Sequence, residues 1–303
     1  MWKIKIKLFL KNTKRNFSLL REGKIGIIGL AIILFFALFA VSYPFWANRD
    51  IDVYDPILGF DETIALHPSP PSPGHPLGTD LQGRDILSQL MYGARMAFTV
   101  GFIAALFSVS IATVIGAVAA YRGGAADTFF MRLANILMLF PFLAFIPVLS
   151  SIMELTLLRY SVIIGLLSGF GGATLIMKSR ALGVVHKPFI ESAKVCGGSS
   201  SHIIRRHVIP NIISLSFLYM MFTVQGAIFS EAILSWLGFL NIRMSWGIML
   251  HTSSRAGYLV GPQLTRYWWM WVPAGFSISF ICAAFYLLGR GLDPVVNPRL
   301  RKR

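Results

Sequence analysis

The sequence predicts an all-α membrane protein with six transmembrane helices and a structured cytoplasmic loop. Of its 303 residues, 55% are hydrophobic and only 14% are charged, and the mean hydropathy is +0.65, which excludes a soluble domain. In lipid, backbone groups must pair within their own helix, so an apolar run of roughly 20 residues predicts a helical span. Six such runs occur, at residues 25–46, 98–120, 129–153, 161–177, 213–234 and 269–288.

The distribution of charge predicts the orientation of these spans. Most of the 28 Lys and Arg lie in the basic N-terminal segment 1–24, in the loops on the same side and in the tail 289–303. The loop 47–97 has an excess of acidic residues instead: Asp50, Asp52, Asp55, Asp61, Glu62, Asp80 and Asp85. The positive-inside rule therefore predicts that both termini are cytoplasmic and that this loop is extracytoplasmic. The net charge of +15 then reflects topology and anionic membrane lipid, and no nucleic-acid partner is expected.

Several spans have features of their own. The basic segment and the run 25–46 exceed the proportions of a signal peptide, so this run is expected to remain as an anchor. Pro141 and Pro147 interrupt the third span, a kink that serves either a pathway or packing. Glycines in the fourth span favour close helix packing at the centre of the bundle: Gly165, Gly169, Gly171 and Gly172. Aromatic residues at the start of the last span predict an interfacial belt: Tyr267, Trp268, Trp269 and Trp271.

The sequence lacks the groups that chemistry inside a membrane would need. No nucleophile with a base, metal-ligand cluster or phosphate-binding loop is visible, which argues against a membrane enzyme. Almost no ionisable side chain lies at mid-bilayer depth, where ion-coupled transporters place theirs. Glu231, near the outer end of the fifth span, either lines a path or reaches the headgroups. An ion-coupled secondary transporter or channel is the alternative class, but the sequence favours a protein whose energy is supplied by a separate protein.

The inner segment 187–211 predicts a helix, a sharp turn and a second helix. Pro188 suits a first helical turn, Gly197 supplies the turn, and Ser199 caps a second helix that we expect to end at Pro210. Side chains at helical spacing predict a small apolar face framed by charge: Phe189, Ala193 and Cys196, with Glu191, Lys194, Arg205 and Arg206. His202 and His207 are five residues apart, so they are expected on different helix faces, and no metal site is expected.

Motifs over residues 70–300 together resemble those of ABC importer permeases. The inner segment contains Glu191-Ser192-Ala193, then Gly197, His207, Pro210 and Asn211, which is similar to the EAA loop of that family. The outer segment contains HPLGTD at 75–80, GRD at 83–85 and YGAR at 92–95, as in the second permease subunit of peptide/nickel-type importers. Further matches are Gly123-Gly124, Asp127, Met131-Arg132, Pro141, Glu231-Ala232, Leu234-Ser235, Leu237-Gly238, Ser245-Trp246-Gly247, Leu288-Gly289 and Asp293-Pro294.

The chain departs from the family pattern at three positions. Ser192 replaces the usual second Ala of the EAA motif, a small change that still allows close approach. Asn135 stands where the family often has Asp, so no role for an acid transfers to it. Arg290 follows Gly289 where Asp is common, and its charge suits a cytoplasmic helix end.

The resemblance implies a permease subunit of an ATP-driven importer, with no active site and no cofactor of its own. Its implied partners in the cell membrane are a second, homologous permease, two cytoplasmic ATPase subunits that bind ATP and Mg, and an extracytoplasmic solute-binding protein. The implied organisation is a first span at 25–46, an outer loop at 47–97 and a five-helix core at 98–288 that contains the inner loop 178–212. The implied cargo is oligopeptides or dipeptides, with oligosaccharides or nickel as alternatives.

The resemblance also implies roles for particular residues. Coupling to the ATPase is expected at Phe189, Glu191, Ser192, Ala193, Gly197, Arg205, Arg206, His207 and Pro210. Docking of the binding protein, or fixing of the outer loop itself, is expected at Gly78, Asp80, Arg84, Asp85 and Arg95. The candidates for the translocation path are Pro141 and Glu231. No catalytic residue and no metal ligand is expected.

Overall fold

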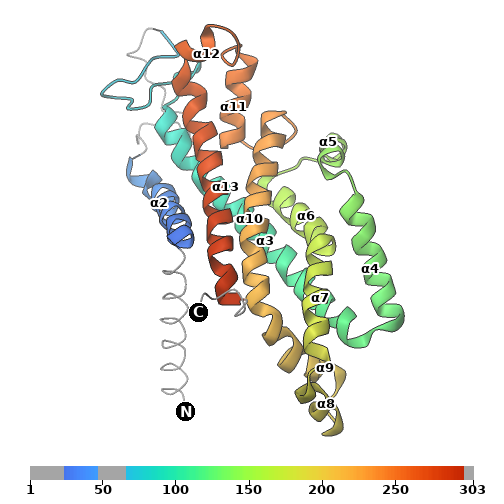
Figure 1. Ribbon diagram of the computed structural model, residues 1–303. Coiled ribbons are helices and arrows are strands. Elements are labelled where there is room, and N and C mark those ends of the chain that lie inside the picture. Colours follow the sequence, from blue (N-terminus) through green and yellow to red (C-terminus); the bar gives the residue numbers. More distant parts are fainter. Residues whose placement is uncertain (1–23, 47–65, 297–303) are drawn as a thin grey trace.

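The described part of the chain, residues 24–46 and 66–296 of a computed structural model, consists of helices joined by turns and loops (Figure 1). The helices are α2 Lys24–Trp46, α3 Ile86–Arg122, α4 Gly124–Leu139, α5 Phe142–Ile152, α6 Leu157–Phe170, α7 Gly172–Val185, α8 Pro188–Val195, α9 Ser200–Ile203, α10 Ile209–Trp236, α11 Trp246–Arg255, α12 Gln263–Arg266 and α13 Trp268–Val296. A π-helical turn, η1, spans Ile204–Val208 between α9 and α10. The all-helical membrane fold predicted from the sequence is confirmed. The basic segment 1–23, the acidic positions between 47 and 65 and the tail 297–303 lie outside the described residues.

The number of spans depends on two bent helix pairs. Four helical segments are long and apolar enough to cross a membrane, and there are six spans if each bent pair counts as one. Helices α4 and α5 meet at 85°, and α6 and α7 meet at 43°. Pro141 stands at the first break as the N-cap of α5, whereas Pro147 lies inside α5 without breaking it. The predicted third span is therefore broken at Pro141, and residues 142–152 form a separate helix.

Helix α3 is the axis of the bundle and packs against α2, α6, α7 and α10. The predicted close packing of glycines is confirmed for two positions of α6. A Cβ added at Gly165 would lie 2.7 Å from the carbonyl oxygen of Ala104, and one at Gly169 would lie 2.9 Å from Cα of Ser108. Gly171 instead marks the break between α6 and α7. Helix α7 continues to Val185, so residues 178–185, predicted as inner loop, are helical.

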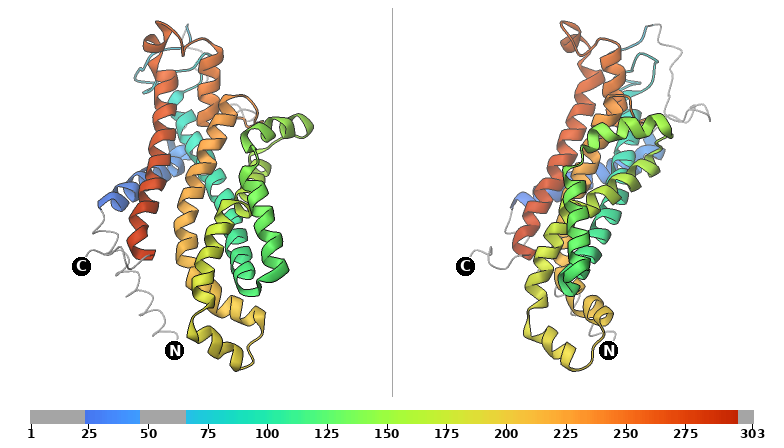
Figure 2. Two further views of the ribbon diagram at one scale, coloured as in Figure 1. Left: turned by 45° about the vertical axis from the view of Figure 1, so that its right-hand side comes forward. Right: turned by 90° about the vertical axis from the view of Figure 1, so that its right-hand side faces the viewer.

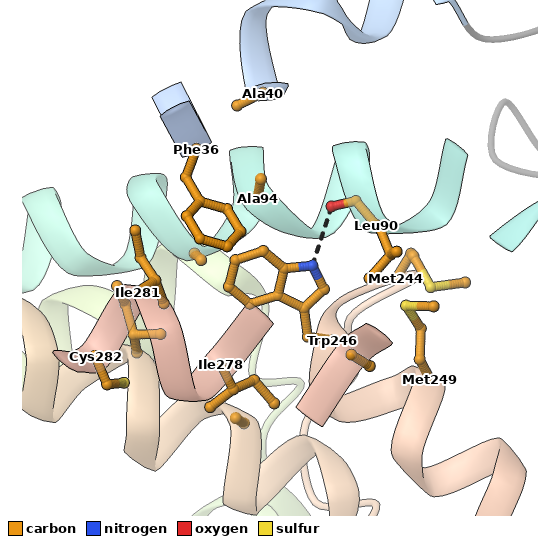
Figure 3. Close-up of a cluster of buried hydrophobic side chains, with 14 of the residues drawn as sticks. Phe36, Ala40, Leu90, Ala94, Met244, Trp246, Met249, Ile278, Ile281 and Cys282 are labelled. Atoms are coloured by element: carbon orange, nitrogen blue, oxygen red, sulfur yellow. Dashed lines mark hydrogen bonds between the residues drawn. The ribbon is translucent and has the colours of Figure 1, made fainter. Parts of the chain in front are cut away.

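The outer end of α3 corrects a second boundary. Residues 86–97, predicted as part of the outer loop, are the first turns of this helix. Asp85 caps it by accepting a 2.7 Å hydrogen bond from the backbone N–H of Ser88. Beyond the apolar run, the helix packs against the buried hydrophobic cluster shown in Figure 3. In this cluster, Trp246 packs edge-on against Phe36 and donates a 3.0 Å hydrogen bond to the carbonyl of Leu90. Tertiary packing therefore extends α3 past the stretch that hydropathy alone identifies.

The two functional ends of the molecule lie far apart. Figure 2 shows α8 and α9 at one end of the bundle, with α11, α12 and the described outer segment at the opposite end. The long helices α3, α10 and α13 run between these ends. A signal between the ends must therefore travel along the spans.

Candidate functional site

The inner segment 187–211 forms the helix, turn and second helix that its sequence predicts. Pro188 occupies the first turn of α8, and Gly197 follows with φ of +79°, a backbone conformation that favours glycine. The backbone N–H of Gly198 donates to the carbonyl of Ala193 at 3.0 Å, which closes the turn. Ser199 caps the second helix by accepting a hydrogen bond from the backbone N–H of His202. The loop is therefore a stiff hairpin of two short helices.

This hairpin is anchored on one side and open on the other. Ile190 is fully buried in a cluster with Val184 of α7 and Ile203, and this cluster fixes α8 to the spans. Phe189 is 40% exposed, and Glu191 and Ser192 are exposed as well. Among the described residues, Glu191 has no ion-pair partner. An anchored helix with an exposed apolar and acidic face is the geometry that a docking element requires.

The structure changes the predicted composition of that face. Ala193 is half-buried and packs toward the Ile190 cluster, while Cys196 and Val195 are exposed. Ile190 and Val195 were missed by sequence reasoning. The spacing of Ile190 relative to Ala193 and to the isoleucines of the second helix was the signal that could have identified the buried anchor.

The second helix of the hairpin does not end at Pro210. It passes through η1 and continues as α10 to Trp236. A π-helical turn bonds residue i to residue i+5, and this irregularity lets the chain accommodate a proline that lacks an N–H. The same turn brings the rings of His202 and His207 to 5.9 Å, so the expectation of different faces was wrong. Arg205 and Arg206 lie on this stretch and line a cleft with Ser199, Ser201 and His202.

The charged residues of the outer segment pair with one another. Asp80 is buried and accepts a 2.6 Å charge-assisted bond from Nε of Arg84. Its other carboxylate oxygen accepts the backbone N–H of Arg84, and Gln89 donates to the same side chain. Asp85, besides capping α3, lies 3.0 Å from Nδ1 of His75. The two carboxylates thus act first on the fold of the segment itself.

The remaining outer candidates also contribute to structure. Gly78 has φ of +77°, and a Cβ added there would lie 2.5 Å from the carbonyl oxygen of Ser69. Arg95, on α3, places its guanidinium 5.4 Å from the ring centre of Tyr43 in α2. Trp269, predicted as part of an interfacial belt, is instead buried and donates to the carbonyl of Thr79. This indole holds the outer segment against α13.

Glu231 lies inside the protein and does not reach the headgroups. Its side chain is 2% exposed, and its carboxylate accepts a 2.6 Å hydrogen bond from the hydroxyl of Ser235. Ser245, the N-cap of α11, bonds the same carboxylate. A Cβ added at Gly247 would lie 2.5 Å from the carbonyl oxygen of Ala232, so α10 and α11 touch here. Glu231-Ala232 and Ser245-Trp246-Gly247, far apart in sequence, form one packed junction.

The two helix breaks lie next to each other. A cavity of about 340 Å³ opens between the end of α4 and the junction of α6 with α7. Its walls come from both breaks: Leu137, Met138, Phe140, Phe142, Leu167, Ser168, Gly171 and Gly172. Neither Pro141 nor Glu231 is among the wall residues, but Phe140 and Phe142, the chain neighbours of Pro141, are. The two candidates for the translocation path, Pro141 and Glu231, therefore lie at different places in the structure.

Comparisons with known proteins agree with this architecture. Residues 112–302 match the family described as binding-protein-dependent transport system inner membrane component. A dipeptide transport system permease protein of Bacillus subtilis (strain 168) is 31% identical over 97% of this chain and 88% of its own length. An oligopeptide transport system permease protein of the same strain is 31% identical over 93% of this chain and 88% of its own.

A third relative comes from a different bacterium. The oligopeptide transport system permease protein of Escherichia coli (strain K12) is 32% identical over 96% of this chain and 91% of its own length. The similarity therefore extends through nearly the whole chain, including the two ends described above. The chain belongs to the family of binding-protein-dependent transport system inner membrane components, and it is a multi-pass permease subunit rather than an enzyme.

Proposed function

We propose that this chain is the permease subunit of an ATP-driven importer of dipeptides or oligopeptides. It forms half of the translocation path with a second, homologous permease. The observation that carries the proposal is the inner hairpin, which is anchored to the spans through Ile190 while Phe189 and Glu191 stay exposed. Of the two ATPase subunits that bind ATP and Mg, one docks on this face and the other on the partner permease, and the hairpin transmits the movement as a rigid body.

Relatives support the choice of cargo. The three relatives compared above are described as dipeptide or oligopeptide permeases, and each matches over most of this chain. This favours peptides over the oligosaccharides or nickel that the sequence left open. A binding protein delivers the peptide at the end of the bundle that carries α11 and the outer segment. The exposed residues Leu81 and Gln82, next to Arg84, belong to the surface it meets, whereas Gly78 itself is buried.

Peptide transport by the complex tests this function. The complex of this chain, its partner permease, two ATPases and the binding protein is reconstituted in liposomes, and uptake of labelled di- to pentapeptides is measured with ATP. We expect peptide-stimulated ATP hydrolysis and accumulation that an excess of unlabelled peptide abolishes. Equal uptake in the absence of ATP would contradict the proposal and favour a channel or an ion-coupled carrier. Stimulation by nickel or an oligosaccharide alone would overturn the choice of cargo.

The proposed orientation has a test that needs no new cysteine. Cys196 is exposed on the inner hairpin, whereas Cys282 is buried in α13. If the hairpin is cytoplasmic, a membrane-impermeant maleimide should label Cys196 only after the cells are permeabilised. The variant Cys196→Ser should lose this labelling. Labelling of Cys196 in intact cells would reverse the orientation, because both termini and the hairpin would then face outward.

A further inference from the structure

Helix α4 contacts α3, α6 and α7, but it buries little of its own surface. It follows Gly123 and Gly124, which have φ of +63° and +55°, and a Cβ added at either position would meet no atom within 4 Å. Within α4 itself, only Ala134 is buried. At its far end, Leu139 is 82% exposed and the chain then turns by 85° into α5. Such a helix can move as a rod about the two glycines.

One ion pair joins this rod to a neighbouring span. Nζ of Lys178 in α7 lies 2.5 Å from the carboxylate of Asp127, in the first turn of α4. The Lys178 side chain is 19% exposed and the Asp127 side chain 29%, so the pair is largely shielded from water. Among the described residues, the other ion pairs join positions close in sequence. This contact is therefore an ionic link between two helices that are far apart in the sequence.

Helix α7 is in turn continuous with the inner hairpin. Its last residue is Val185, and α8 begins at Pro188. Ala181 and Val184 of α7 pack in one buried cluster with Ile190 of α8. Around Lys178, α7 is also pressed on α3, because a Cβ added at Gly116 would lie 2.7 Å from the backbone nitrogen of Lys178. The hairpin, α7 and α3 are therefore packed as one unit, whereas α4 is joined to α3 through two glycines of positive φ.

We propose that the Asp127–Lys178 ion pair is the positioning contact that makes α4 follow the inner hairpin, so that ATPase movement opens and closes the cavity between the helix breaks. This rests on the proposed coupling role of the hairpin. Without the pair, rotation at Gly123 and Gly124 absorbs the movement before it reaches α4. With the pair, the movement is applied to α4 close to Gly123 and Gly124, the residues about which the helix rotates.

The geometry amplifies a small displacement. At 1.5 Å per residue, Asp127 lies about 5 Å along the helix from Gly124, and Leu139 lies about 22 Å along it. A shift at the ion pair is thus enlarged about fivefold at the far end. There, Sδ of Met138 lies 3.9 Å from the position of a Cβ on Gly172, beside the break of α6 and α7. Both residues line the cavity of about 340 Å³, so this movement changes its width.

The test separates charge pairing from general stability. The single variants Asp127→Asn and Lys178→Met are compared with a double variant, Asp127→Lys with Lys178→Asp, which swaps the two charges. The control is Asp293→Asn, because it removes the exposed Arg290–Asp293 pair. The measured quantity is peptide imported per ATP hydrolysed by the reconstituted complex. We expect each single variant to lower this ratio about tenfold, within the usual range of coupling energies. The swapped pair should restore at least half of it, and the control should match the wild type.

A second measurement addresses the movement itself. In a background with Cys196→Ser and Cys282→Ser, Met138→Cys and Gly172→Cys are joined by a short thiol cross-linker. The cross-linked complex should lose uptake, and cleavage of the linker should restore it. Unchanged uptake after cross-linking, or a swapped pair no better than the single variants, would overturn the proposal. If Phe189→Ala also left coupling unchanged, the proposed coupling role of the hairpin would be wrong. If Phe189→Ala uncoupled the complex and Asp127→Asn did not, only the proposed role of the Asp127–Lys178 pair would be wrong.

Discussion

Replacing Gly197 with tryptophan should abolish peptide-stimulated ATP hydrolysis while the complex of membrane subunits still assembles. Gly197 is exposed at the tip of the inner hairpin, and a Cβ added there meets no atom within 4 Å, so the new side chain starts into open space. It would instead project from the face that docks on the ATPase. Loss of a central interface contact of this kind costs about 2–4 kcal/mol, which corresponds to a fall of roughly 30- to 1,000-fold in affinity.

The control for this variant is Gly197→Asn. Gly197 has φ of +79°, and asparagine tolerates this conformation better than other residues with a side chain. This variant has a smaller backbone cost than tryptophan and carries a small polar side chain, so most of the stimulation should survive. ATPase assays with the purified complex, together with pull-down of the ATPase subunits, measure both effects. Full stimulation in Gly197→Trp would show that this surface of the hairpin does not dock.

Replacing Trp246 with alanine should cause the largest loss of stability of any single truncation in the outer half. The side chain is 2% exposed, packs against Phe36 and bonds the carbonyl of Leu90, so it ties α11 to α2 and α3 (Figure 3). Its removal leaves a cavity in a cluster that includes Ile278 and Met249. Truncation of a buried aromatic residue costs about 3–5 kcal/mol, a large part of the total stability of a typical domain.

The matched control is Trp268→Ala, because Trp268 is 43% exposed at the start of α13. Thermal unfolding in detergent, followed by the fraction of monodisperse protein, should show a large shift for Trp246→Ala and a small one for Trp268→Ala. Trp246→Phe should fall between them, since it keeps most of the packing and loses the hydrogen bond. Gly93→Ala should also be destabilising, because its new Cβ overlaps the indole of Trp246. Equal shifts for the two tryptophans would refute the assigned role of Trp246.

The candidate sites were predicted to very different degrees. The inner hairpin follows from local rules, because Pro188, the turn at Gly197 and the Ser199 cap act on their immediate neighbours. The outer charged residues were identified as a group, but the sequence did not decide between docking and internal pairing. The structure pairs Asp80 with Arg84 and places Asp85 against His75. Those contacts depend on how the segment folds back on itself.

The path candidates show where local reasoning ends. Pro141 predicts an interrupted hydrogen-bond ladder, but not whether the chain bends slightly or turns by 85°. Glu231 looks accessible from its position near a span end, yet Ser245 of α11 covers it. The π-helical turn that brings His202 and His207 together has no hydropathy signal at all. The burial of Glu231, in particular, depends on a segment that is distant in sequence.

The sequence by itself determined that this chain is a multi-span helical permease with a basic inner hairpin, because apolar run length, charge bias and short motifs are properties of contiguous residues. Only the tertiary structure decided where the spans break, how far α3 extends, and that Asp127 meets Lys178. Periodicity describes one helix at a time, whereas breaks, buried carboxylates and ion pairs between helices depend on which surfaces pack together. The proposed link from the hairpin to α4 belongs to this second kind of information.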